Sequence, residues 1–176
     1  MAGIDETLKF IPIRIAVLTV SDTRTAAEDK SGDVLAERVS KAGHVLAARS
    51  IVKDDVGLIV KSLRQGIDDP LTDVIITTGG TGVTGRDVTP EALARVCDKD
   101  IPGFGECFRW ISYKMIGTST IQSRACAGVA KETFIFALPG SPGACRDGWD
   151  EILQYQLDSR YRPCNFVELI PRLSEK

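Results

Sequence analysis

The chain has 176 residues, of which 43% are hydrophobic and 26% are charged, and its net charge at pH 7 is −2. These values are ordinary for a globular protein, and the length suits one domain with a sizeable core. The small net charge gives no support for a nucleic-acid-binding surface, so no nucleic-acid partner is expected. No run approaches the roughly 18 apolar residues of a membrane span, so no membrane partner is expected either.

The cysteines and the first residues of the chain favour a reducing compartment. The five cysteines form no C-x-x-C pair and their number is odd, which is typical of free thiols. The stretch 1–9 carries Asp5 and Glu6 and lacks the apolar core of a signal peptide. A cytoplasmic location is therefore expected. The single histidine, His44, cannot form a metal cluster alone, and a structural role is expected for it.

The first half of the chain alternates strand and helix patterns. Residues 1–12 are expected to form a loose N-terminal arm. Residues 13–20 are nearly all apolar, which predicts a central strand buried on both faces. A helix capped by Ser31 follows, and residues 45–52 predict a strand nearer the edge of the sheet. An apolar stripe over residues 56–67 predicts the next helix.

The centre of the chain, residues 74–91, combines a strand, a loop and a helix start. Its β-branched run predicts a buried strand. The glycine loop, residues 79–85, has four glycines in seven residues and no bulky side chain, so its backbone can approach a ligand closely. Thr89-Pro90-Glu91 is typical of a helix start, with Thr89 as the N-cap and the helix running to about Cys97.

The last third of the chain continues the alternation. Residues 104–116 predict a helix whose wide apolar surface suits either deep core or a subunit contact. Its stripe is expected to include Met115. Residues 133–138 predict a buried strand, and a helix over about 145–157 follows. Residues 161–176 are expected to be an irregular tail.

This alternation predicts an α/β fold, with residues 13–160 as a single three-layer domain around a mainly parallel sheet. Ligands of such sheets bind beyond the carboxyl ends of the strands. A polar cluster follows each of four predicted strands. The clusters are Ser21-Asp22, Asp54-Asp55, the glycine loop and Gly140-Ser141. If the strands are parallel, all four clusters lie at one edge, where they would form a site.

The glycine loop does not fit the common nucleotide loops. Residues 80–85 spell G-x-G-x-x-G, but a dinucleotide fingerprint needs its helix to open inside the glycine run. A Walker A loop needs a lysine that this loop lacks. Arg86 follows instead, and because arginine binds phosphate or carboxylate with two hydrogen bonds, an anionic ligand is expected.

Two aspartates have two interpretations each. Asp87 is either a turn residue that accepts hydrogen bonds from backbone N–H groups or a ligand of Mg²⁺. Asp54 is either the N-cap of the helix over 56–67 or a second metal ligand. Magnesium prefers one or two carboxylates together with substrate phosphates and water.

Several motifs together resemble the molybdopterin-binding family of molybdenum cofactor biosynthesis. The longest is Thr78-Gly79-Gly80-Thr81-Gly82 with Arg86-Asp87-Val88-Thr89-Pro90-Glu91-Ala92. The stretches 18–23, 29–32, 123–128 and 138–142 also resemble family motifs, so the resemblance covers about residues 10–167. Residues 10–12 and 162–166 are more similar to the MoaB branch of the family than to the MogA branch.

The resemblance implies a Rossmann-like fold and a molybdopterin adenylyltransferase, which transfers AMP from ATP to the terminal phosphate of molybdopterin in the presence of Mg²⁺. A non-catalytic molybdopterin-binding protein of the same pathway is the alternative. Family members are trimers or larger assemblies, so a homo-oligomer, trimer or hexamer, is expected.

The resemblance also implies residue roles. Asp54 and Asp87 match the catalytic and metal-binding aspartates, although Lys53 stands where a proline is common, which leaves Asp55 as a rival of Asp54. Ser21 and Asp22 are the expected nucleotide-binding residues. The expected molybdopterin-binding residues are Gly79, Gly80, Thr81, Gly82, Arg86, Ser123, Gly140 and Ser141.

Overall fold

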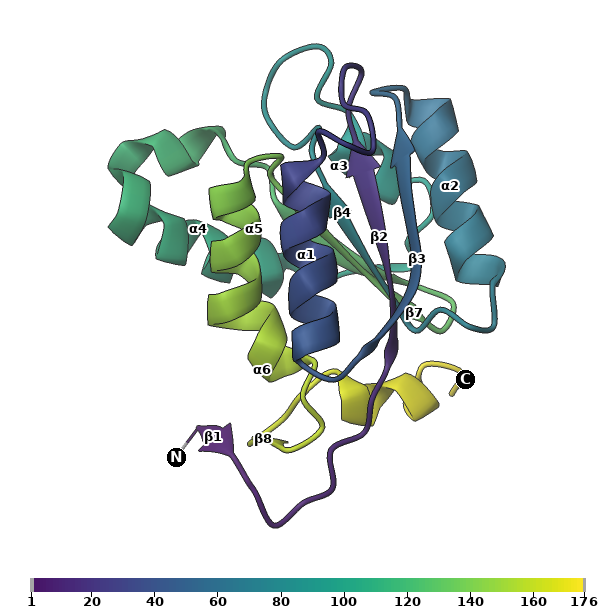
Figure 1. The fold of residues 1–176 in the computed structure, drawn as a ribbon, viewed down its shortest axis with the longest axis vertical. Helices are drawn as coiled ribbons and strands as arrows, with labels where there is room; N and C mark the ends of the chain where they lie inside the picture. Colours follow the sequence, from purple (N-terminus) through teal and green to yellow (C-terminus); the bar gives the residue numbers. More distant parts are fainter. Residues whose placement is uncertain (1, 176) are drawn as a thin grey trace.

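The computed structural model describes residues 2–175, and within them a six-stranded sheet lies between two layers of helices (Figure 1). The strand order is β3-β2-β4-β7-β6-β5. The strands are β2 Arg14–Val20, β3 Val45–Val52, β4 Val74–Thr78, β5 Lys99–Asp100, β6 Cys126–Ala130 and β7 Thr133–Leu138. The helices are α1 Lys30–Lys41, α2 Val56–Asp68, α3 Thr89–Leu93, α4 Pro102–Ile116, α5 Pro142–Gly148 and α6 Gln154–Gln156. The predicted three-layer α/β fold is confirmed.

Four strands of the sheet are parallel, and their ends are in register. β3, β2, β4 and β7 run in one direction, so the residues that follow them meet at the same edge. β6 pairs antiparallel with β7, and β5 pairs antiparallel with β6. The sequence did not predict β5 and β6, because β5 has two residues and β6 consists of small residues without alternation. The sheet is therefore mixed.

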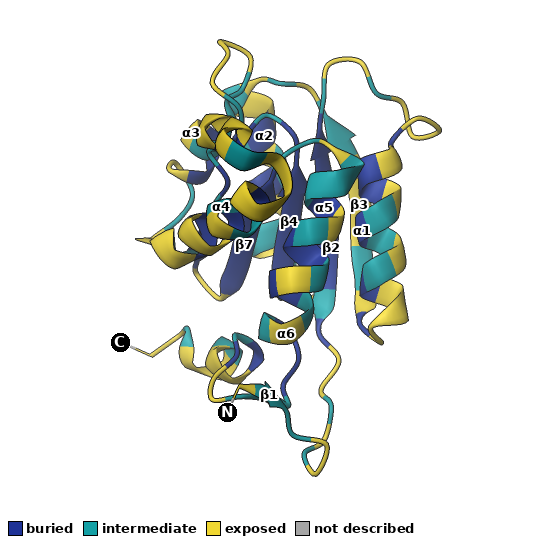
Figure 2. Ribbon diagram, turned by 90° about the vertical axis from the view of Figure 1, so that its left-hand side faces the viewer, coloured by how far each residue is buried: buried dark blue, intermediate teal, exposed yellow. Residues whose placement is uncertain are grey.

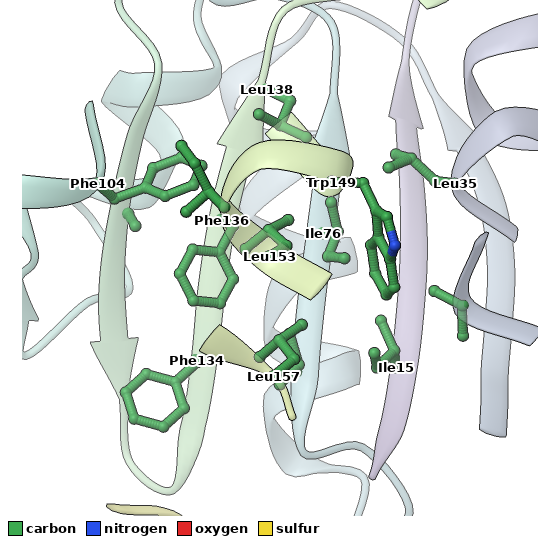
Figure 3. Packing of buried hydrophobic residues seen from close by; sticks show 14 of the residues in the cluster. Ile15, Leu35, Ile76, Phe104, Phe134, Phe136, Leu138, Trp149, Leu153 and Leu157 are labelled. Carbon is green, nitrogen blue, oxygen red and sulfur yellow. The ribbon is translucent and has the colours of Figure 1, made fainter. Parts of the chain in front are cut away.

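One face of the sheet packs against α1, α4 and the helical segment from α5 to α6, which continues through the π-helical turn η2 Trp149–Leu153. Phe134 and Phe136 of β7 point into this layer beside Leu153 and Leu157, and Trp149 packs near Ile15 and Leu35 (Figure 3). Full burial of a large apolar side chain contributes about 1.5–3 kcal/mol. This cluster is the larger part of the core and fixes the helices against the sheet.

The opposite face of the sheet packs against α2 and α3. Ile59 and Leu63 of α2 are fully buried against Ile75 and Ile135. The apolar stripe predicted for residues 56–67 is therefore the packed face of α2. Figure 2 shows the buried strands between the two helical layers. No helix among residues 2–175 is both long and apolar enough to span a membrane.

Two predicted helix starts are wrong in detail. Asp29, not Ser31, is the N-cap of α1, and its Oδ1 accepts a hydrogen bond from the Gly32 N–H at 3.0 Å. Thr89 is not an N-cap but the first residue of α3, because its hydroxyl is already bonded to the Gly79 carbonyl at 2.8 Å. α3 is also shorter than predicted, with five residues ending at Leu93.

Helix α4 buries only part of its apolar surface. Phe104 and Phe108 are buried, as the stripe predicts. Met115 was expected in the same stripe but is 68% exposed, since the helix extends past the edge of the sheet (Figure 1). Trp110 and Tyr113, which lie off the stripe, are also exposed. The outer half of α4 is therefore apolar and unpacked within this chain.

The arm and the tail, expected to be loose and irregular, pair with each other. β1 Gly3–Ile4 is antiparallel to β8 Tyr161–Arg162, at the opposite end of the molecule from the carboxyl ends of the parallel strands (Figure 1). The tail then forms the 3-10 helix η3 Val167–Arg172. These contacts join segments about 150 positions apart. No local sequence pattern can predict contacts over such a distance. The outermost positions of the predicted arm and tail, 1 and 176, lie outside the described residues.

Candidate functional site

A cavity of about 400 Å³ lies at the carboxyl edge of the parallel strands. Its floor comes from the loops after β2, β3, β4 and β7, and one wall comes from α4 and the 3-10 helix η1 Gly117–Gln122. The predicted site residues that line it are Ser21, Asp54, Gly79, Gly80, Thr81, Gly82, Asp87, Ser123, Gly140 and Ser141. The convergence of the four polar clusters at one edge is therefore confirmed.

The glycine loop is held by backbone hydrogen bonds on both sides. The Gly79 N–H donates to the Leu138 carbonyl at 3.0 Å, and the Gly80 carbonyl accepts from the Thr89 N–H at 2.9 Å. Gly79 has φ +106° and Gly80 has φ +64°, and residues that carry a side chain rarely adopt such backbone angles. A Cβ on Gly79 would also come within 2.2 Å of the Val20 carbonyl oxygen. Glycine is therefore required at both positions.

Two glycines of the loop lie against the two candidate aspartates. A Cβ on Gly80 would stand 3.2 Å from Oδ1 of Asp54, and a Cβ on Gly82 would stand 2.7 Å from Oδ2 of Asp87. The absence of side chains at Gly80 and Gly82 is what lets both carboxylates approach the loop backbone. Both carboxylates therefore lie next to the same loop.

Asp55, not Asp54, caps helix α2. Its carboxylate accepts a hydrogen bond from the Leu58 N–H at 2.9 Å, as an N-cap does. The N-cap interpretation of Asp54 is therefore wrong, and its side chain lines the cavity instead. Burial raises the pKa of Asp54 above the ordinary value for aspartate, and the negative charge of Asp22 adds to the rise.

Asp87 has the hydrogen bonds of a turn aspartate and also lines the cavity. Its Oδ2 accepts from the Thr84 hydroxyl at 2.6 Å and from the Thr84 N–H at 2.9 Å. The Thr84 hydrogen bonds hold the pKa of Asp87 below its usual value. The two interpretations of Asp87 are thus compatible, because the turn orients a carboxylate that stays ionised at neutral pH.

Arg86 and Asp22 do not line this cavity. They form an ion pair with each other, with Nη2 of Arg86 at 2.5 Å from Oδ2 of Asp22, and the Arg86 side chain is 67% exposed. The hydrogen bonds from Arg86 lower the pKa of Asp22. Asp22 also accepts from the Asp54 N–H at 3.3 Å. This pair links the loop after β2 to the end of the glycine loop and to the β3 end.

The remaining predicted residues are held by local bonds. Ser141 caps α5 by accepting from the Ala144 N–H at 3.1 Å. The Ser123 hydroxyl accepts from the Ala125 N–H at 3.3 Å. A Cβ on Gly140 would stand 3.2 Å from the Cα of Gly79, so the two loops pack backbone against backbone.

Two arginines organise the site although sequence reasoning did not select them as site residues. Arg24 lines the cavity and donates to the Gly140 carbonyl at 2.7 Å and to the Ser31 hydroxyl at 2.5 Å. Arg24 lies in a polar loop that offered no signal of its own.

Arg124 binds the backbone of the glycine loop and of its neighbour. It donates to the Gly82 carbonyl at 2.6 Å and to the Asp87 carbonyl at 2.5 Å, and it pairs with Glu91. The Ser123-Arg124 motif did mark this position, but only its serine was assigned a role. Arg124 therefore fixes the loop that carries both Gly82 and Asp87.

The fold is that of a Rossmann-like α/β protein, with a cavity beyond the ends of the parallel strands that is lined by glycine backbone and two carboxylates. Comparisons with known proteins agree with this class. The family described as "Probable molybdopterin binding domain" matches residues 16–159. The "Molybdenum cofactor biosynthesis protein B" of Escherichia coli K12 is 49% identical over 158 residues, which are 90% of this chain and 93% of that protein.

Solved structures of similar proteins superpose over nearly the whole chain. A crystal structure of a "Molybdenum cofactor biosynthesis protein B" has a TM-score of 0.85 and 39% identity, covering 94% of this chain and 98% of that one. The "tungsten cofactor synthesizing protein MoaB" from Pyrococcus furiosus has a TM-score of 0.75 and 34% identity, covering 93% and 98%. The chain therefore belongs to the molybdopterin-binding family of molybdenum cofactor biosynthesis proteins.

Proposed function

We propose that the protein is a molybdopterin adenylyltransferase. An oxygen of the terminal phosphate of molybdopterin attacks the α-phosphorus of ATP and forms a new P–O bond. The bond from that phosphorus to the oxygen bridging to the β-phosphate breaks, and pyrophosphate leaves with the electron pair. The products are adenylyl-molybdopterin and pyrophosphate. Membership of the molybdopterin-binding family supports molybdopterin as the acceptor of AMP. The two carboxylates in the cavity support the transfer of AMP.

The observation that carries this proposal is the position of Asp54 and Asp87 in one cavity, each against a glycine of the same loop. A protein that only binds an anion gains nothing from carboxylates beside phosphate, because like charges repel. Carboxylates at such a place are useful when a cation lies between them and the phosphates.

The donor chemistry of the site fits Mg²⁺. Among residues 2–175, no group of three His, Cys, Asp or Glu side chains is placed to hold a metal. Two carboxylates completed by phosphate and water oxygens are the set that Mg²⁺ prefers. The raised pKa of Asp54 reflects burial and the nearby charges of Asp22 and Asp87, which a cation would offset. When bound, Mg²⁺ would reduce the negative charge of the reacting phosphates.

The chain itself would bind and orient the substrates. The open backbone of the glycine loop lets the phosphates lie close to Asp54 and Asp87. Arg24 places a positive charge in the cavity, and arginine is suited to phosphate. The hydroxyls of Ser123 and Ser141 line the other side, where they can bond a polar ligand. Orienting two reactants in this way contributes much of the rate of phosphoryl-type transfer.

The direct test is to incubate the protein with molybdopterin, ATP and Mg²⁺ and to detect adenylyl-molybdopterin by mass spectrometry. Asp87→Asn should retain pterin binding and lose most of the turnover, by about 10²-fold or more, because a metal ligand is lost. Unchanged turnover would remove Asp87 from the catalytic role. Pterin binding without any adenylylated product at saturating ATP and Mg²⁺ would instead identify a non-catalytic molybdopterin-binding protein.

The protein is further proposed to act as a homo-oligomer. The exposed apolar side chains of α4 and η1 support this, since they lie together and include Trp110 at 63% and Ile121 at 77% exposure. Sedimentation should show a trimer or hexamer, and Ile121→Asp should weaken it. A monomer at micromolar concentration would contradict this part of the proposal.

A further inference from the structure

A second cavity, of about 590 Å³, adjoins the first one. The two cavities share Ser21 and Arg24 in their linings. The other lining residues are Asp22, Thr25, Ala26, Arg49, Ser50, Ile51, Val52 and Lys53. Lys53 in the second cavity is followed directly by Asp54 in the first.

The second cavity carries three cations and one carboxylate. Asp22 is already paired with Arg86. Arg49 is bound by Asp29 and Asp33, at 2.9 and 2.6 Å. Both of these side chains are therefore committed to partners within the chain.

The other two cations are Arg24 and Lys53. Arg24 is held by neutral oxygens, with the buried Asp29 carboxylate 3.9 Å away. Lys53 is exposed and takes part in no ion pair among the residues that the structure describes. The ammonium group of Lys53 is thus the cation in this cavity whose charge is available to a ligand.

The geometry of the proposed reaction gives this second cavity a role. In a transfer at phosphorus the attacking and leaving oxygens lie roughly in line on opposite sides of the phosphorus. If molybdopterin approaches from the first cavity, the leaving group must point away from it. The second cavity shares Ser21 and Arg24 with the first, its Lys53 directly precedes Asp54, and it carries the positive charge that a leaving polyphosphate needs.

We infer that the second cavity binds the β- and γ-phosphates of ATP, and after the transfer the pyrophosphate, with Lys53 as the main contact and Arg24 at the junction of the two cavities. This inference rests on the proposed adenylyl transfer for its place in the reaction. The binding of inorganic pyrophosphate itself requires no turnover and can be measured separately. Lys53 is then a substrate-binding residue directly beside Asp54.

The test is calorimetric titration of the protein with pyrophosphate in the presence of Mg²⁺, using Lys53→Met and the matched control Lys61→Met. Lys61 is an exposed lysine of α2 that lines neither cavity, so both variants lose one positive charge. Lys53→Met should bind pyrophosphate about tenfold more weakly and raise the KM for ATP by a similar factor, as loss of one charge-assisted contact implies. Lys53→Arg should restore most of the binding.

Binding of AMP, which has no β- or γ-phosphate, should change less than twofold in Lys53→Met. Equal pyrophosphate affinity in Lys53→Met and Lys61→Met would overturn the inference, as would no pyrophosphate binding by the unmodified protein. If the protein has adenylylation activity and Lys53→Met has no effect, the proposed function stands and this site does not. Pyrophosphate binding that depends on Lys53 in a protein without adenylylation activity leaves the site standing without the proposed function.

Discussion

Gly82 lies directly against the carboxylate of Asp87, so that a Cβ on Gly82 would stand 2.7 Å from Oδ2 and 3.0 Å from Cγ. Real Cβ atoms do not come so close, and Asp87 is also bound by Thr84. Gly82→Ala must therefore move the carboxylate. A Cβ on Gly85, in the same loop, would have no atom within 4 Å, which makes Gly85 the natural control.

We expect Gly82→Ala to lower the rate of adenylylation by about 10²-fold, since a displacement near 1 Å at a reacting centre has an effect of that size. Gly85→Ala should change it less than twofold. Rates of product formation at saturating substrates measure both variants. If the two variants were equally active, the contact between Gly82 and Asp87 would have no part in the reaction.

Arg124→Lys should reduce activity although the charge is conserved. The planar guanidinium of Arg124 binds the Gly82 carbonyl, the Asp87 carbonyl and Glu91 at once. A lysine ammonium cannot reproduce this planar arrangement of N–H donors. The glycine loop would then be held less well, and we expect kcat to fall by about tenfold or more. Arg95→Lys, at an exposed position away from the cavity, is the control. A kcat for Arg124→Lys equal to that of the control would contradict this role.

Asp54→Asn should stabilise the protein at pH 7 while it reduces activity. Burial and then the charge of Asp22 raise the pKa of Asp54 in the folded state, so its ionised form is less favourable there than in the unfolded chain. Above that pKa the ionised carboxylate therefore lowers the free energy of unfolding. Asparagine removes this cost, and the Tm of Asp54→Asn should exceed that of the unmodified protein at neutral pH.

The difference in Tm should shrink as the pH falls through the raised pKa, because the unmodified side chain then becomes neutral in the folded state. Mg²⁺ with ATP should raise the Tm of the unmodified protein more than that of Asp54→Asn. Asp55→Asn is the matched control, since asparagine also caps a helix and Asp55 lies outside the cavity. A Tm difference that stays constant down to acid pH would show that Asp54 has an ordinary pKa.

Thr77→Val should stabilise the fold. Thr77 is fully buried, and among the described residues its hydroxyl has no hydrogen-bond partner. Removing an unpaired buried hydroxyl should raise the free energy of unfolding by about 1–3 kcal/mol. Thr19 on the adjacent strand is also fully buried, but its hydroxyl donates to Asp29 at 2.7 Å.

Thr19→Val should accordingly lower the free energy of unfolding by about 1.5–3 kcal/mol, because it leaves a buried carboxylate with one partner fewer. Urea denaturation of the two variants measures both changes. Destabilisation of similar size in both would mean that the Thr77 hydroxyl is bonded in solution.

The elements that the sequence predicted best are those that bury a long, regular apolar pattern. β2, β4, β7 and α2 are close to their predicted limits, because each has a strong period or an unbroken β-branched run. β6 was not predicted because its small residues carry no alternating pattern. The pairing of β1 with β8 was not predicted because the two strands lie at opposite ends of the chain. Distance along the chain also explains why Arg24 was missed, since its two hydrogen bonds join the loop after β2 to the start of α1 and to the loop after β7.

The sequence by itself determined that a glycine loop, two aspartates and several polar clusters follow the strands of an α/β sheet, and its motifs indicated the family. Only the tertiary structure showed that Asp55 caps helix α2 while Asp54 faces the cavity. It also turned Arg86 away from the cavity onto Asp22 and brought Arg124 onto the loop. Such choices depend on the direction in which each side chain leaves the backbone, and that direction is set by packing between segments far apart in the chain.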